Sequence, residues 1–238
     1  MLLMIQGIPV DFRAKRGDYL EQCAAEYTAP PGTAPDFSVE ASDDEIAALR
    51  RRLRKGDETS DAQLEGMILY HHFCDRLPAY DAVLFHAAVL LCDGMTIAFT
   101  AKSGTGKSTH VAYWKSLYGD HVRILNGDKP LLLLRGGVVY AADAPFRGKE
   151  GWGIPGGRER LDVVCFLSRG QQNAVSPLSA QDAIPLLYPM LHPPRTPKDA
   201  AHVANLLDVL TRQARFFRLS CTKDASAARR CHDTLLGR

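Results

Sequence analysis

The chain has no Cys-x-x-Cys pair, although it contains six cysteines in 238 residues. Without such a pair the sequence gives no support for a zinc ribbon, and the scattered cysteines do not suggest a disulfide framework. The chain also lacks an apolar run long enough to cross a bilayer, and residues 1–12 lack the basic start and cleavage site of a secretory signal. We therefore expect a cytoplasmic protein whose cysteines are mostly small buried hydrophobes.

Net charge is low as well. A formal charge of +2 gives no electrostatic argument for nucleic acid or an anionic membrane as a partner. The apolar and charged fractions, 46% and 24%, are those of an ordinary globular protein, and the length allows a substantial core. We expect two parts: residues 1–80 as an N-terminal strand and helical segment, and residues 81–238 as the main core.

Apolar periodicity and turn signals predict alternating strands and helices. In the first part we expect an edge strand over residues 1–12, which Pro9 would suit, and helices over 43–50 and 60–76. The strands expected in the second part are 82–91, 95–100, 121–125, 131–134, 138–140, 161–167 and 216–220. The helices expected there are 109–117, 179–191, 199–213 and 223–236.

Two turn signals indicate how these strands pair. Asp93 and Gly94 separate two apolar runs, as do Gly136 and Gly137, and such turns predict antiparallel hairpins. A purely parallel sheet is therefore not expected. The fold class that follows is α/β, with a mixed, hairpin-rich sheet and flanking helices.

A glycine-rich motif stands between a predicted strand and a predicted helix. Residues 101–109 read Ala-Lys-Ser-Gly-Thr-Gly-Lys-Ser-Thr, which is typical of a P-loop whose backbone N–H groups converge on a polyphosphate. Lys107 would reach the β- and γ-phosphates of ATP, and Ser108 would place its hydroxyl on Mg²⁺. Ala101 stands where the pattern has its first glycine, so an ordinary Gly-Ser turn is the competing interpretation. The predicted nucleotide-binding residues are Ser103, Gly104, Thr105, Gly106, Lys107, Ser108 and Thr109.

Asp128 is the candidate for a second Mg²⁺ ligand. It follows a predicted strand within Asn-Gly-Asp-Lys-Pro at residues 126–130, where nucleotide-binding enzymes of this type place an acidic ligand. Asn-Gly-Asp is also ordinary turn chemistry, so a turn aspartate is the alternative. Residues 148–157 hold five glycines and predict a loop that either covers the nucleotide site or simply connects two elements.

Four segments together resemble the catalytic core of the HPr serine kinase/phosphorylase family. They are Phe-His-Ala-Ala at 85–88, Phe-Thr-Ala-Lys-Ser-Gly-Thr-Gly-Lys-Ser-Thr-His at 99–110, Asn-Gly-Asp-Lys-Pro at 126–130 and Ala-Pro-Phe-Arg-Gly-Lys at 144–149. The similarity is closest to short bacterial relatives of that family. It implies a fold like that of phosphoenolpyruvate carboxykinase. It also implies ATP- and Mg²⁺-dependent phosphorylation of a hydroxyl, with a serine of a protein or peptide as the expected acceptor.

The same resemblance assigns catalytic roles. His86 matches a family histidine beside the phosphates, and Asp128 matches the second member of an Asp-Asp pair that binds metal and activates the acceptor. Lys149 matches a lysine near the γ-phosphate, where it would join Lys107 in neutralising the transferred charge. From the residues alone, His86 can equally be a hydrogen-bonded core histidine and Lys149 a solvated loop residue.

The sequence departs from the family in ways that bear on activity. Gly127 stands where the family has its first acidic residue, so one carboxylate would serve as both metal ligand and base, or the acid function is weakened. The segment before the core is shorter than in full-length members, and the phosphorylase signature is not recognisable in residues 151–157. HPr itself is therefore not the expected substrate. A small-molecule kinase and a catalytically silent ATP-binding sensor are the alternatives, and self-association stays open because full-length members form hexamers.

Overall fold

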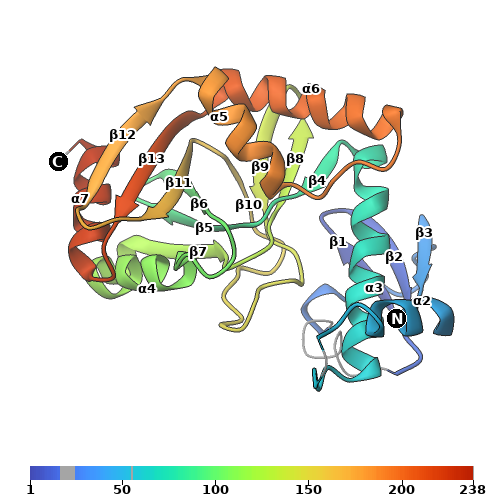
Figure 1. Ribbon diagram of the computed structural model, residues 1–238. Coiled ribbons are helices and arrows are strands. Elements are labelled where there is room, and N and C mark those ends of the chain that lie inside the picture. Colours follow the sequence, from blue (N-terminus) through green and yellow to red (C-terminus); the bar gives the residue numbers. More distant parts are fainter. Residues whose placement is uncertain (17–24, 55, 238) are drawn as a thin grey trace. The chain divides into compact units, whose positions relative to one another are not determined.

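The computed structural model describes residues 1–16, 25–54 and 56–237. The chain divides into two compact units, Met1–Leu77 (unit 1) and Pro78–Arg238 (unit 2). Within the described residues there are three sheets and six α-helices, so the protein is mixed α/β (Figure 1). Among these helices, none combines the length and apolar composition that crossing a bilayer requires.

Unit 1 contains a three-stranded sheet with the order β1-β2-β3. Its elements are β1 (Leu2–Ile5), β2 (Ile8–Arg13), η1 (Ala25–Tyr27), β3 (Phe37–Glu40), α2 (Asp43–Arg50) and α3 (Asp61–Arg76). β1 and β2 form an antiparallel hairpin, so the prediction of one edge strand over residues 1–12 was wrong. The reason is the turn at Gln6 and Gly7, which both have positive φ. Pro9 lies in the middle strand, where its carbonyl accepts a hydrogen bond from the N–H of Asp36 at 2.8 Å.

Both helices of unit 1 begin at a serine that forms a capping box. The hydroxyl of Ser42 accepts from the N–H of Glu45, and that of Ser60 accepts from the N–H of Gln63. In each case the side chain of the later residue accepts a hydrogen bond from the serine N–H. Reciprocal bonds of this kind satisfy two N–H groups that a helix start otherwise leaves open. The predicted helices over residues 43–50 and 60–76 are confirmed.

Unit 2 contains a six-stranded and a four-stranded sheet. The six-stranded sheet has the order β12 (Ala174–Leu178), β13 (Arg215–Cys221), β11 (Val163–Arg169), β6 (Met95–Thr100), β5 (Ala87–Cys92) and β7 (Val122–Asn126). The four-stranded sheet has the order β10 (Arg158–Arg160), β9 (Val138–Ala142), β8 (Leu131–Arg135) and β4 (Ala82–Leu84). The helices of unit 2 are η2 (Leu77–Tyr80), α4 (Lys107–Tyr118), η3 (Gly119–His121), α5 (Ala180–Leu187), η4 (Tyr188–Met190), α6 (Pro197–Gln213) and α7 (Ala225–Leu236).

The sheet pairing confirms the mixed, hairpin-rich prediction. β6 pairs antiparallel with β5 and parallel with β11, while β8 and β9 form a second antiparallel pair. The turn residues Asp93 and Gly94 have φ values of 47° and 80°, and Gly136 and Gly137 are also left-handed. Two consecutive residues with positive φ give the twist that a tight hairpin needs.

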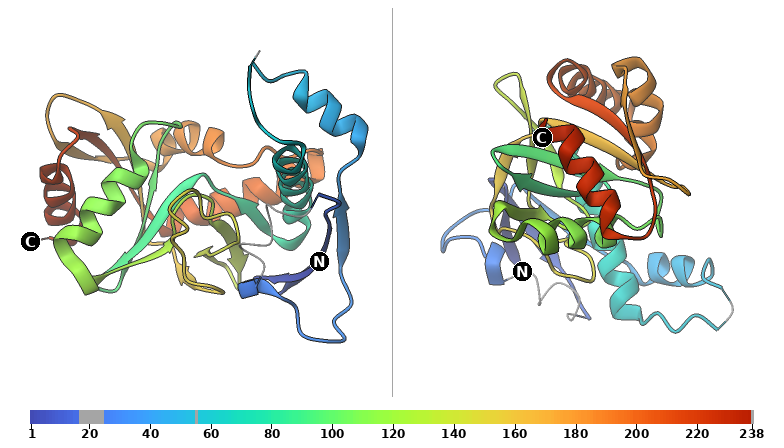
Figure 2. Two further views of the ribbon diagram at one scale, coloured as in Figure 1. Left: turned by 90° about the horizontal axis from the view of Figure 1, so that it is seen from below. Right: turned by 90° about the vertical axis from the view of Figure 1, so that its left-hand side faces the viewer.

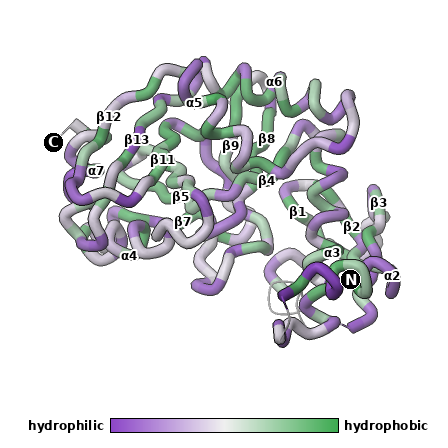
Figure 3. The backbone as a smooth tube through the Cα atoms, in the orientation of Figure 1, coloured by the Kyte–Doolittle hydropathy of each residue, from purple (hydrophilic) through white to green (hydrophobic). Residues whose placement is uncertain are grey.

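The six-stranded sheet is covered on both faces. Side chains alternate along β6: Ile97 and Phe99 pack with α4 and α7, whereas Ala98 packs with α5, α6 and the four-stranded sheet. Both views of Figure 2 place α4 beside α7. Along the central strands the tube is mostly green, while green and purple alternate along α6, as expected for a helix with one buried face (Figure 3).

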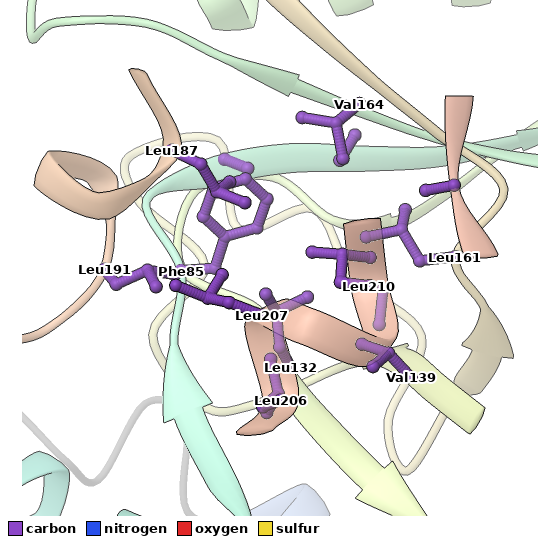
Figure 4. Close-up of a cluster of buried hydrophobic side chains, with 14 of the residues drawn as sticks. Phe85, Leu132, Val139, Leu161, Val164, Leu187, Leu191, Leu206, Leu207 and Leu210 are labelled. Carbon is purple, nitrogen blue, oxygen red and sulfur yellow. The ribbon is translucent and has the colours of Figure 1, made fainter. Parts of the chain in front are cut away.

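The core under α5 and α6 is built from large aliphatic side chains. Phe85 is fully buried there, near Leu187 and Leu191 and in the same cluster as Leu206 and Leu210 (Figure 4). Burial of one such side chain contributes about 2 kcal/mol to the free energy of unfolding. This core holds the segment that leads to His86.

The predicted strand over residues 82–91 is divided between two sheets. β4 ends at Leu84 and β5 begins at Ala87, so Phe85 and His86 form the link. The N–H of Phe85 bonds to the carbonyl of Pro130 at 3.0 Å, and the N–H of His86 bonds to that of Met190 at 2.7 Å. Because of these bonds, the backbone does not continue from β4 into β5 as one strand. Residues 82–91 contain no glycine or proline and are apolar apart from His86, so no turn signal marks the break.

Candidate functional site

The connection between β6 and α4 is residues 101–106, here called the glycine-rich loop. Gly104 and Gly106 have φ values of 75° and 118°, in the region that favours glycine. Gly106 is the N-cap of α4, and as a glycine it has no side chain to accept a hydrogen bond from the first turn of that helix. First-turn N–H groups and the positive end of the helix dipole together favour an anion at this position.

Three side chains from separate elements meet beside this helix start. The Nζ of Lys107, the first residue of α4, lies 2.8 Å from the Nε2 of His86. The same nitrogen of His86 lies 3.4 Å from an Oδ atom of Asp128. Lys107 is buried, with 7% of its surface exposed, while about a third of each of the other two side chains is exposed. A cation, an imidazole and a carboxylate therefore form one group that opens to solvent on one side.

One ring nitrogen of His86 faces both partners. It cannot accept from the ammonium of Lys107 and donate to the carboxylate of Asp128 at the same time. The 2.8 Å distance to Lys107 is that of an ordinary hydrogen bond, whereas the 3.4 Å distance to Asp128 is longer than one.

Burial and neighbouring charges shift the pKa values of the two charged members. Burial lowers the pKa of Lys107, and the positive charge of Lys129 lowers it further, although the carboxylate of Asp128 acts in the opposite direction. Burial by itself raises the pKa of Asp128. The contact with His86 and the nearby Lys129 and Lys107 outweigh it, so this pKa lies below its ordinary value. Asp128 is therefore ionised at neutral pH.

Asp128 is held by a turn built on Asn126. The Oδ1 of Asn126 accepts from the N–H of Asp128 at 3.0 Å and from the N–H of Lys129 at 2.8 Å. Its Nδ2 donates to Asp143 at 2.8 Å and to the carbonyl of Ala144 at 3.1 Å. A fully buried amide with all these bonds fixes the backbone on which Asp128 stands. The sequence predicted Asp128 but missed Asn126.

A buried ion pair continues this network. Asp143 is fully buried and accepts two bonds from Arg147, at 2.7 Å from Nη2 and 3.2 Å from Nε. A Cβ added to Gly153 would lie 2.1 Å from the Nε of Arg147 and 2.7 Å from an Oδ of Asp143. The bare backbone of Gly153 therefore makes room for the pair. Asp143 directly follows the apolar run 138–142, and an acidic residue at the end of an apolar strand was the signal that could have identified it.

The segment 147–153 also packs directly on the Asp128 turn. A Cβ on Gly148 would lie 2.9 Å from the Cβ of Asp128, and one on Gly127 would lie 3.2 Å from the carbonyl oxygen of Arg147. The N–H of Gly127 donates to the carbonyl of Trp152 at 2.9 Å. Position 127 is thus closely covered by backbone, and an acidic side chain does not fit there without a shift.

The remaining predicted site residues lie at different depths. Ser103 and Thr109 are exposed, and Ser108 is half-buried in the first turn of α4. Lys149 is exposed, and none of the described contacts joins it to Lys107, His86 or Asp128. The structure therefore brings together three of the four catalytic candidates.

An arginine that the sequence did not reveal contacts the loop. Arg169, the last residue of β11, donates from Nη2 to the carbonyl of Gly104 and from Nε to that of Thr105 at 3.4 Å. It follows a buried apolar strand, as many functional polar residues do, but that position alone is not specific.

Two cavities flank the glycine-rich loop. One of about 490 Å³ is lined by residues 100–105 and 166–169 together with Leu186 and Met190. The other, of about 350 Å³, is lined by residues 104–106, Thr109, His110, Tyr113, Arg169 and residues 221–223. A cavity of about 790 Å³ lies within unit 1 along β3 and α3, and none of the loop residues contributes to it.

Comparison with known proteins gives little further information. No family model matches the sequence, and no curated protein matches it. Among solved structures, the HPr(Ser) kinase/phosphatase from Coxiella burnetii is similar with a TM-score of 0.38 and 10% identity, over 65% of this chain and 93% of that one.

Proposed function

We propose that unit 2 is an ATP- and Mg²⁺-dependent kinase that transfers the γ-phosphoryl group to a hydroxyl, with a serine of a protein or peptide as the acceptor. The observation that carries this proposal is the group formed by Lys107, His86 and Asp128 at the uncapped start of α4. Catalysis of phosphoryl transfer depends almost entirely on positioning and on electrostatic stabilisation, and these residues supply both.

The triphosphate would bind across the glycine-rich loop. Backbone N–H groups of residues 103–109 would surround the phosphates, and Arg169 would hold the loop carbonyls on the other side. An ammonium group has three donors, and Lys107 uses one of them on His86. The other two can reach phosphate oxygens. Because Lys107 is buried, its charge is screened little by water.

The donors available for a metal fit Mg²⁺. The hydroxyl of Ser108 and the ionised carboxylate of Asp128 are hard oxygen ligands, the type that Mg²⁺ prefers. When bound, Mg²⁺ would neutralise the negative charge that develops on the transferred phosphoryl group. Asp128 would also orient the acceptor hydroxyl. A carboxylate that binds a metal is a weak base, so the chain would rely on alignment more than on proton abstraction.

The two cavities beside the loop suit the two substrates. We assign the nucleoside to the cavity beside Tyr113, because it borders the first turn of the helix that would hold the phosphates. We assign the acceptor to the cavity beside Met190. That cavity adjoins His86, since the carbonyl of Met190 accepts from the N–H of His86 and the hydroxyl of Thr100 donates to its carbonyl.

The proposal is tested with the full chain, Mg²⁺ and radiolabelled ATP. Calorimetry should detect ATP binding, and transfer to a pool of serine-containing peptides should fall by roughly 100-fold or more in Lys107→Ala and Asp128→Asn. Lys198→Ala changes an exposed lysine in the first turn of α6, outside both cavities, and is the control, which should retain activity. Failure of the folded protein to bind any purine triphosphate would refute the proposal. Equal activity of Lys107→Ala and the unchanged chain would also refute it.

One observation favours a second candidate function, an ATP-binding sensor that transfers no phosphate. Position 127 carries no acid, and the backbone of Arg147 covers it closely. A protein with a single carboxylate at this site could bind Mg²⁺ and ATP without activating an acceptor. Tight ATP binding together with no transfer to peptides or small alcohols would support this function over the kinase.

A further inference from the structure

Three side chains of types that bind metals lie together at the C-terminal end of α4, away from the glycine-rich loop. Cys92 ends β5, Asp93 begins the turn to β6, and His232 lies in α7. One potential ligand atom from each of these three lies within 4.8 Å of the other two. Cys92 and Asp93 lie about 140 residues before His232 in the sequence, so no local motif indicates that the three meet.

The surroundings hold these side chains in place. Cys92 is 1% exposed and His232 is 5% exposed, while Asp93 reaches the surface. The ring of Tyr118 stacks on that of His232, with centroids 3.9 Å apart and an interplanar angle of 13°. The backbone pairing of Cys92 with Val122 anchors the end of β5 against β7. The thiol and the imidazole are therefore part of the packed core rather than mobile surface groups.

The outer hydrogen bonds are those found around bound metals. The Nδ1 of His232 lies 3.2 Å from a carboxylate oxygen of Asp233, which leaves Nε2 for another partner. The Nδ1 of His121 lies 2.9 Å from an oxygen of Asp93. Metal-binding histidines usually donate their other nitrogen to a carboxylate, and metal-binding carboxylates are usually hydrogen-bonded in turn.

We propose that Cys92, Asp93 and His232 bind a zinc ion, with water in the fourth position. Thiolate, imidazole and carboxylate together suit Zn²⁺, whereas Mg²⁺ and Ca²⁺ take oxygen ligands. Tetrahedral zinc holds its ligand atoms about 3.5 Å apart, so atoms that lie within 4.8 Å of one another would close by at most about 1.3 Å on binding. Asp93 is the most exposed of the three residues, so rotation of its χ angles would make most of that movement.

This site is separate from the proposed Mg²⁺ site. α4 begins at Lys107 and ends at Tyr118, and a helix of 12 residues is about 18 Å long. Zinc would join the β5–β6 turn to α7. Its role is therefore stabilisation of unit 2, because a ligand that binds only the folded state raises the free energy of unfolding.

The test uses the full chain, stripped with a chelator, without nucleotide. Co²⁺ is the probe, since a cobalt–thiolate bond gives a charge-transfer absorption that oxygen and nitrogen ligands do not. The band should form in the unchanged chain and be absent in Cys92→Ala. Cys74→Ala, at a buried cysteine of unit 1, is the matched control and should keep the band. Asp128→Asn should keep it too, which separates this site from the phosphate site.

Two further variants keep the proposal testable if Cys92→Ala does not fold. Asp93→Asn is expected to fold, because residue 93 has a φ of 47° that asparagine tolerates. Zn²⁺ should raise the thermal midpoint of the unchanged chain and leave that of Asp93→Asn unaffected. His121→Gln should weaken zinc binding by only about 10-fold. Absence of a thiolate band, its persistence in Cys92→Ala, or an equal midpoint shift in Asp93→Asn would overturn the proposal.

Discussion

The ammonium nitrogen of Lys107 lies 2.8 Å from the Nε2 of His86, and this contact aims a buried cation at the start of α4. Lys107 has only 7% of its surface exposed, so few water molecules can replace His86 as its partner. Two hydrogen bonds fix the backbone of His86. Its N–H donates to the carbonyl of Met190, and its carbonyl accepts from the hydroxyl of Thr100. His86 therefore acts on the proposed reaction as a positioning residue, through Lys107.

Replacement of His86 should affect turnover more than nucleotide binding. We expect His86→Ala to lower kcat by roughly 100-fold with little change in the KM for ATP, since Lys107 loses its orientation but keeps its charge. His86→Gln offers an oxygen that can accept from Lys107 and should restore part of the loss. Steady-state kinetics with varied ATP give both constants. A raised KM with unchanged kcat would contradict the positioning role.

Gly153→Ala should disrupt the buried pair of Asp143 and Arg147. The added methyl group would fall 2.1 Å from the Nε of Arg147, which forces the guanidinium away from its carboxylate. We expect the free energy of unfolding to fall by about 3 kcal/mol, as measured by chemical denaturation. Gly151→Ala is the control, because nothing lies near its Cβ and its φ of 64° alone should cost about 1 kcal/mol. Equal losses in the two variants would mean that the pair is not what Gly153 protects.

An acid introduced at position 127 should not increase the proposed phosphoryl transfer. Gly127→Ala and Gly127→Asp both place a Cβ 3.2 Å from the carbonyl oxygen of Arg147 and 3.3 Å from the Cβ of Trp152. We expect each to lower the free energy of unfolding by about 1–3 kcal/mol and to reduce phosphoryl transfer through movement of Asp128. If Gly127→Asp were more active than the unchanged chain, a second acid would be compatible with this turn after all.

His110 should make stability depend on pH under mildly acidic conditions. Burial lowers its pKa from 6.5 to about 4, and its Nε2 accepts a 3.0 Å bond from the indole of Trp114. Between these two pKa values the unfolded chain binds a proton that the folded chain does not. The free energy of unfolding therefore falls as the pH drops from about 6.5 to about 4, by at most about 3 kcal/mol.

The measurement is chemical denaturation across that pH range for the unchanged chain and for His110→Gln. Glutamine keeps an acceptor for Trp114 but does not titrate, so the difference between the two curves isolates His110. We expect that difference to follow the pH as stated. Parallel curves would show that His110 takes up its proton equally in both states.

Local patterns predicted the framework of the site. The hairpin at Asp93 and the helix after the glycine-rich loop depend on a few neighbouring residues, so turn signals and periodicity were sufficient. The P-loop pattern predicted that Lys107 and Asp128 share one site, whereas His86 was expected there only through family resemblance, because proximity between separate elements has no signal in composition.

Other features depend on distant partners. The link at Phe85 and His86 arises from bonds to Pro130 and Met190, which lie 45 and 104 positions later in the chain, so the local sequence could not reveal it. β12 contains Pro177 and mostly exposed residues, and it pairs only with β13 among the described strands. Such an edge strand is defined by its neighbour more than by its own sequence. Asp143 likewise owes its burial to Arg147 and to the bare backbone of Gly153.

Because the strand is divided between Leu84 and Ala87, the proposed reaction depends on the relative position of the two sheets of unit 2. His86 stands where the chain crosses from the four-stranded to the six-stranded sheet, so a slip of one sheet against the other would pull the imidazole from Lys107. Movement of one sheet relative to the other would thus misplace the ammonium group of Lys107 and leave the glycine-rich loop unchanged. A compound that wedges these layers apart would inhibit without competing for the nucleotide.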